Sequence, residues 1–230
     1  MSDITNLDQL GARALTALLR GCYFQFWGLL VLLASLAEAL ITPTLRPLSV
    51  VLICGGALGM VVGAGQFVRV NGLGNSWRRR TRELLVVAAA AAYLSLFFIM
   101  WRQRSSNSYL LAHGLLFLGA VVALLCLICL PVAELARLAG RTSLAIQSVA
   151  FGTVAIVLLV PPFGYVVLSL LPAIRQHGDT FGILQWWVTG APQWLLLLLL
   201  APASLTLSLL WTTKDLVLEY LAADRLNPHT

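Results

Sequence analysis

Charged side chains are scarce in this chain. Asp, Glu, Lys and Arg make up 10% of its 230 residues, whereas hydrophobic residues make up 60%. Soluble domains carry about 25% charged residues, which cover the surface that faces water. The mean hydropathy of +0.90 points the same way. The composition therefore argues against a water-soluble domain and favours a protein embedded in a membrane.

Residues that carry chemistry are also few. We find no nucleophile elbow, no phosphate-binding glycine loop and no paired carboxylates in the sequence. His113 is the only histidine in an apolar run, so a haem between helices would lack a second axial side chain there. Cys126 and Cys129 form a C-x-x-C pattern, but its leucine-rich surroundings disfavour a thiolate. We expect no catalytic residue, no metal site and no cofactor, and we lean away from an enzyme.

Long apolar runs fill most of the sequence. Six stretches contain no Asp, Glu, Lys or Arg: 21–37, 47–68, 84–101, 105–133, 142–174 and 180–213. A helix needs about 20 apolar residues to cross the hydrocarbon core. The runs are continuous rather than alternating, which favours helices over the strands of a barrel. We predict an all-α, polytopic membrane bundle with about six transmembrane helices, spanning 22–41, 48–68, 84–101, 109–130, 146–171 and 192–212.

The two ends of the chain are expected to lie outside the transmembrane domain. Residues 1–21 are predicted to contain an amphipathic helix at the membrane interface, because apolar side chains recur there at helical spacing. Residues 22–212 form the six-helix transmembrane domain, and 213–230 a short cytoplasmic helix. A cleaved signal peptide that ends near Ala37-Glu38-Ala39 is the alternative for the first segment. The apolar stretch from Cys22 to Ile41 is long for a signal.

The Lys and Arg residues lie mostly on one side of the predicted spans. With the N-terminus inside, the inner side holds Arg13, Arg20, Arg69, Arg78, Arg79, Arg80, Arg82, Arg137, Arg141, Lys214 and Arg225. The outer side holds Arg46, Arg102, Arg104 and Arg175. Basic residues concentrate on the cytoplasmic side of membrane proteins. We therefore expect a cell membrane protein with both termini in the cytoplasm. The same bias accounts for the basic excess, so we expect no nucleic acid partner.

Glycines mark the second predicted span. Gly55, Gly59 and Gly63 recur every four residues. Such a stripe lets another helix approach closely, so that van der Waals packing holds the two together. The neighbour could be a helix of the same chain, another membrane protein or a second copy.

Two consecutive prolines lie inside the fifth predicted span. Pro161 and Pro162 remove two backbone donors and disfavour helix before them, so we predict a kink or a break. Transporters expose backbone groups to substrates through broken helices. A kink with no substrate role is the alternative, because neighbouring helices can satisfy the freed groups.

A dense basic loop precedes the third predicted span. Arg78, Arg79, Arg80 and Arg82 fall within five residues. They are candidates for contact with anionic lipid headgroups or with an acidic partner. They could also serve only to set the topology of the chain.

The outer side offers one further cluster. Residues 181–188 are expected to form a short helix on the outer surface, after a loop that contains Arg175, His177 and Asp179. An enzyme that modifies lipids could place its active site in such a loop. General acid–base catalysis, however, needs positioned groups within reach of a substrate, and the sequence does not show that positioning.

These features support one leading hypothesis and two alternatives. The leading hypothesis is a non-enzymatic membrane subunit or scaffold that works through helix–helix contacts, with the lipid bilayer and a membrane protein or a second copy as partners. The alternatives are a small transporter or facilitator for neutral or lipid-like solutes, and a membrane enzyme that acts on lipid.

Overall fold

The chain folds entirely into helices. The computed structural model describes residues 7, 10–42, 46–175 and 178–226, and within these it has seven helices and no strand. The helices are α1 (Ala12–Ile41), α2 (Pro47–Val68), α3 (Gly74–Gln103), α4 (Ser108–Leu138), α5 (Thr142–Arg175), α6 (Thr180–Gly190) and α7 (Gln193–Leu226). All except α6 are long and apolar enough to cross a membrane. The predicted all-α bundle with six spans is confirmed, and the protein is a multi-pass membrane protein.

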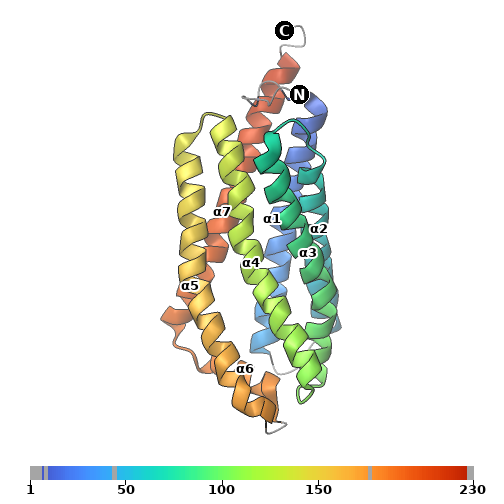
Figure 1. Ribbon diagram of the computed structural model, residues 1–230, viewed down its shortest axis with the longest axis vertical. Helices are drawn as coiled ribbons and strands as arrows, with labels where there is room; N and C mark the ends of the chain where they lie inside the picture. The colour runs from blue at the N-terminus through green and yellow to red at the C-terminus, as the bar shows by residue number, and fades with distance from the viewer. Residues whose placement is uncertain (1–6, 8–9, 43–45, 176–177, 227–230) are drawn as a thin grey trace.

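The six long helices form an elongated bundle (Figure 1). Consecutive helices are neighbours, and α7 closes the ring by contacting α1, α4 and α5. The start of α1 and the end of α7 lie together at one end of the bundle (Figure 1). We call this the terminal end, and we call the opposite end, where α6 lies, the α6 end. The short helix expected over 181–188 is confirmed as α6.

Several helices run further at the terminal end than the predicted spans. The predicted boundary between 21 and 22 lies inside α1, and the boundary between 212 and 213 lies inside α7, without a break at either point. The end segments are therefore not separate helices within the described residues. Arg, Glu, Leu and Ala are all good helix formers, so a charged residue ends an apolar run without ending the helix.

Leucines before and at the start of α1 pack onto the bundle. Leu7 and Leu10 are buried, as are Leu15 and Leu18 of α1. These leucines join a core cluster that includes Phe67 of α2. These leucines therefore face other helices of the chain, and the location of residues 1–21 at the membrane interface stays a prediction.

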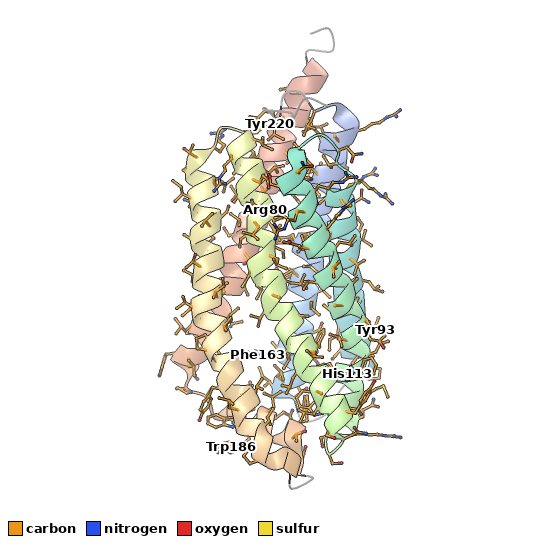
Figure 2. All side chains as sticks on the ribbon, in the orientation of Figure 1. Arg80, Tyr93, His113, Phe163, Trp186 and Tyr220 are labelled. Carbon is orange, nitrogen blue, oxygen red and sulfur yellow. The ribbon has the colours of Figure 1, made fainter. Side chains whose placement is uncertain are left out.

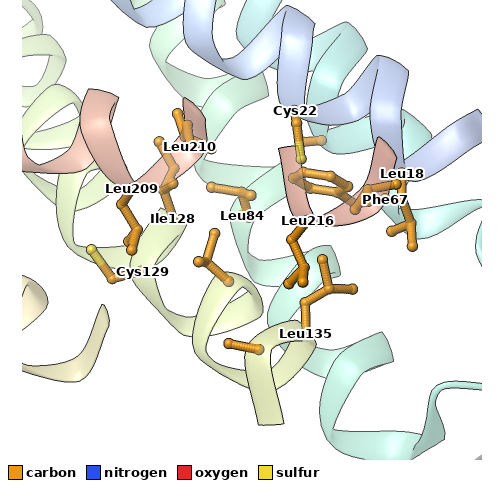
Figure 3. Packing of buried hydrophobic residues seen from close by; sticks show 14 of the residues in the cluster. Leu18, Cys22, Phe67, Leu84, Ile128, Cys129, Leu135, Leu209, Leu210 and Leu216 are labelled. Carbon is orange, nitrogen blue, oxygen red and sulfur yellow. The ribbon is translucent and has the colours of Figure 1, made fainter. Parts of the chain in front are cut away.

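Two clusters of buried side chains form the core. The first lies toward the terminal end, where side chains from α1, α2, α3, α4 and α7 meet (Figure 3). The second lies toward the α6 end and is rich in aromatic rings. There Phe98 and Trp101 of α3 contact Phe181 of α6, with ring centroids 5.9 and 5.1 Å apart. Trp101 is fully buried, because α6 covers the end of α3.

The helices differ in how much of their surface the bundle covers. In α1 to α4, 39 to 44% of the most apolar stretch is buried, against 22% in α5 and 28% in α7. Residues 193–200, the first part of α7, include no buried side chain. The bundle therefore has a densely packed part, α1 to α4, and a sparsely packed part, α5 and α7.

Candidate functional site

Helices α1 and α2 cross with backbone close to backbone, and glycines make the contact. A methyl group in place of a Gly28 hydrogen would lie 2.9 Å from the Met60 backbone nitrogen and 3.0 Å from the Gly56 carbonyl oxygen. A methyl group on Gly56 would lie 2.7 Å from the backbone nitrogen of Leu32. Because backbone stands against backbone here, no side chain can move aside to make room.

A buried amide lies in the same interface. The Gln25 side chain is fully buried, and its Nε2 donates a hydrogen bond of 2.9 Å to the Met60 carbonyl oxygen. A methyl group on Gly63 would lie 2.9 Å from the Gln25 backbone nitrogen and 3.0 Å from the Gly21 carbonyl oxygen. Gln25 is not among the candidate residues predicted from the sequence. It is the only amide in the run 21–37, and Gly21 and Gly28 flank it at helical spacing.

The three glycines of the predicted stripe do not share one face. Gly63 lies against α1, and a methyl group on Gly59 would lie 3.2 Å from the Gly28 Cα atom. Gly55 is exposed and has nothing within 4 Å of such a methyl group. A four-residue step rotates about 40° beyond a full turn of an α-helix, so a strict four-residue repeat drifts off the contact face. The contact uses Gly56 in place of Gly55.

The four arginines near the start of α3 are divided between two sides of the helix. Arg80 lies between α3 and α4 (Figure 2). Its Nη1 atom is 3.2 Å from Glu134 Oε2 and 3.4 Å from the Leu130 carbonyl oxygen of α4. The Ser76 hydroxyl also donates to Glu134, whose side chain is only 12% exposed. Arg80 therefore joins two helices of the chain.

The other three arginines line an open groove on the outside of α3. Its volume is about 590 Å³, and the residues that line it are Asn75, Arg78, Arg79, Arg82, Glu83, Val86 and Val87. Arg79 Nε is 2.8 Å from Glu83 Oε1, one turn further along the helix. We call this feature the α3 groove.

The proline pair does not interrupt α5. The helix is continuous from Thr142 to Arg175 and contains both Pro161 and Pro162. Of the predicted kink or break, the uninterrupted helix leaves only the kink, which stays a prediction. The second half of α5 leans toward α6 (Figure 1). Phe163 packs close to Gly119 of α4 (Figure 2), which keeps this part of α5 on the bundle.

Of the polar cluster predicted in the loop before α6, the structure describes the side chain of Asp179 alone. Asp179 Oδ1 accepts a hydrogen bond of 2.8 Å from the Gly182 backbone N–H and so caps the start of α6. His177 lies outside the described residues, and Arg175 is the last residue of α5.

A different set of contacts holds the α6 end together. The Arg102 side chain of α3 donates to the carbonyl oxygens of Ala39 and Thr42, at the end of α1. Gln185 of α6 donates to the same Thr42 oxygen at 2.6 Å. The Trp101 indole donates to the Thr180 hydroxyl at 2.9 Å. The bonds to Ala39 and Thr42 satisfy carbonyl groups that the end of α1 leaves without an internal partner.

Within the described part of the chain, no group of three or more His, Cys, Asp or Glu side chains could hold a metal ion. The His113 ring packs beside Tyr109 and Phe97, with its Nδ1 atom 2.9 Å from the Tyr109 carbonyl oxygen. Comparison with protein-family models, curated proteins and solved structures found no match to this chain.

Proposed function

We propose that this protein is a membrane subunit or scaffold, and that it binds another membrane protein through the exposed surface of α5 and of the first half of α7. This α5–α7 surface comprises Val157, Val160, Leu168, Trp194, Leu197 and Leu200, all of which are exposed. Helices in a bilayer associate through van der Waals packing and interhelical hydrogen bonds. The sparsely covered helices therefore have the most to gain from a further neighbour.

The observation that carries this proposal is the position of Pro161 on the uncovered side of α5. Pro161 has no N–H, so the carbonyl group of Val157 loses its usual donor four residues along the helix. Both residues are exposed, and the Val157 side chain is 62% exposed. Lipid tails offer no hydrogen bonds. A neighbouring helix with a hydroxyl or amide donor would satisfy this carbonyl group.

Site-specific photocrosslinking in native membranes tests the proposal. A photoreactive amino acid replaces Val157 or Leu197 on the α5–α7 surface. Matched control positions are Leu58 of α2 and Leu96 of α3, which are 58% and 53% exposed. We expect a discrete adduct with a second membrane protein from the first two positions and only lipid adducts from the controls. Lipid adducts alone at all four positions would contradict the proposal.

The orientation of the chain is part of the same proposal. The terminal end carries the exposed side chains of Arg13, Arg20, Arg137 and Arg141, and the bias of basic residues favours the cytoplasm for this end. A membrane-impermeant thiol reagent distinguishes the two sides. The reagent should label the variant Arg104→Cys in intact cells. It should label the variant Arg137→Cys only after lysis.

The two alternatives have less support. The transporter hypothesis depended on a broken fifth helix, and α5 is continuous through its prolines. The lipid-enzyme hypothesis depended on the loop before α6, where Asp179 is engaged in capping. We therefore put forward the subunit or scaffold alone.

A further inference from the structure

We propose that the α3 groove binds the headgroup of an anionic phospholipid in the leaflet at the terminal end. The partner is a phosphodiester with a net negative charge, held by Arg78, Arg79 and Arg82. The α3 groove is a different surface from the α5–α7 surface. The proposal of a lipid site is therefore independent of the proposed protein partner.

The order of side chains along the groove matches the order of groups in a phospholipid. The lining residues recur at three- and four-residue steps from Asn75 to Val87, which places them on one side of α3. The arginines lie nearer the terminal end, and Val86 and Val87 lie further toward the middle of the bundle. A phosphate at the arginines would therefore place an acyl chain along the valines.

Arginine suits this partner because its planar guanidinium can donate two parallel hydrogen bonds to phosphate oxygens. Arg78, Arg79 and Arg82 are all exposed. The opposite side of α3 is fixed in the bundle by Trp77, which is buried, and by the ion pair of Arg80 with Glu134. These contacts inside the bundle fix the orientation of the helix turns that carry the three exposed arginines.

Glu83 makes the groove sensitive to a single charge. Its carboxylate pairs with Arg79, so a lipid phosphate must compete with it for that guanidinium. Neutralising Glu83 should free Arg79 and strengthen lipid binding. A surface that attracted lipid only through the overall charge of the protein would gain equally from neutralising any other acidic residue at this end.

The test uses the purified full-length protein in a mild non-ionic detergent. The protein is titrated with phosphatidylglycerol or, separately, with phosphatidylcholine, and bound lipid is counted by native mass spectrometry. The variants are Arg78→Gln/Arg79→Gln/Arg82→Gln and Glu83→Gln. A matched control, Arg13→Gln/Arg20→Gln/Arg137→Gln, removes the same charge from exposed positions at the same end. The variant Asp215→Gln is the matched control for Glu83→Gln, and a separate arm adds excess inorganic phosphate.

We expect tight binding of phosphatidylglycerol over phosphatidylcholine in the wild type. The α3 triple variant should lose roughly a hundredfold in affinity, since a basic residue near the membrane surface contributes about one factor of five to anionic lipid binding. The control triple variant should stay within about threefold of the wild type, because its arginines lie outside the groove. Glu83→Gln should bind several times more tightly, Asp215→Gln should not, and phosphate should not displace the lipid.

Three results would overturn the proposal. Equal losses of lipid affinity in the two triple variants would show that binding depends only on the net charge of the protein. Displacement of the lipid by inorganic phosphate would make the groove a general anion site. Unchanged lipid binding in the α3 variant would point to an acidic protein partner for the arginines. Size-exclusion profiles of all variants, which change only exposed side chains of the groove and its controls, show whether each remains folded.

Discussion

Helices α1 and α2 meet through glycines, whereas α5 and the first half of α7 present large apolar side chains to their surroundings. Gly28 and Gly56 bring two backbones together, and Gln25 adds a hydrogen bond across the same contact. Along α7, Trp194, Leu197 and their neighbours up to 200 are not buried. Both regions are equally apolar in composition, so hydropathy does not distinguish them.

The comparison shows what decides packing when every helix is hydrophobic. Lipid tails are as apolar as leucine, so burial of leucine alone gives little reason for two membrane helices to associate. Close backbone approach and buried hydrogen bonds supply that reason, and α1 and α2 have both. The sparse contacts of α5 and α7 follow from the lack of a similar glycine contact between them among the described residues.

The largest effect should come from two adjacent glycines of α2, of which Gly56 faces α1 and Gly55 is exposed. Gly56→Leu forces side-chain atoms into the α1 backbone, and overpacking of this kind costs about 3 kcal/mol or more. Gly55→Leu adds the same atoms on the exposed side, where nothing opposes them, so it should not lower the free energy of unfolding. Chemical denaturation in mixed micelles measures both. Equal destabilisation would remove the distinction between the two faces.

The next effect should come from Arg80 in the densely packed part. Arg80→Gln leaves the Glu134 carboxylate in the α3–α4 contact without its cation, which should cost about 2 kcal/mol after allowing for partial exposure of the arginine. Arg78→Gln, two residues earlier on the exposed side, is the control and should cost almost nothing. The same denaturation measurement applies. A double variant with Glu134→Gln should recover part of the loss, and failure to recover any would count against the ion pair.

A smaller effect is expected at Gln25. Gln25→Leu removes the hydrogen bond to Met60, and such bonds between membrane helices contribute about 0.6 kcal/mol on average. The change also removes the buried Oε1 atom, which has no hydrogen-bond partner among the described residues. We therefore expect a change of less than about 1 kcal/mol. A loss several times larger would show that Gln25 holds α1 and α2 together more than the glycines do.

The six spans could be predicted because the length of an apolar run depends on the bilayer, not on the partners of each residue. The residues at which the helices end could not be predicted in this way. Residues 12–21 and 213–226 continue α1 and α7 because helix propensity carries the backbone past the first charged side chain. Hydropathy indicates where a helix leaves the hydrocarbon core, and these helices continue beyond that point.

The direction of a side chain was the harder part of the candidate site. The four-residue spacing selected Gly55 over Gly56, although the contact face of an α-helix follows alternating steps of three and four. Arg80 could not be separated from Arg78, Arg79 and Arg82 by sequence, because its partner Glu134 belongs to another helix. Pairings between distant segments depend on the fold itself.

The smallest change in the free energy of unfolding should come from a substitution in the sparsely packed part. This variant tests most directly whether that part is free to bind a partner. Leu197→Ala removes exposed apolar atoms from α7, so the free energy of unfolding should change by less than about 0.5 kcal/mol. The same change should lower the yield of the protein adduct from a photoreactive group at position 157, because it thins the surface that the proposed partner covers. Leu96→Ala on α3 is the control for both measurements. If Leu197→Ala destabilised the isolated protein as much as Arg80→Gln does, the first half of α7 would be held within the chain, and the α5–α7 surface would not be free for a partner.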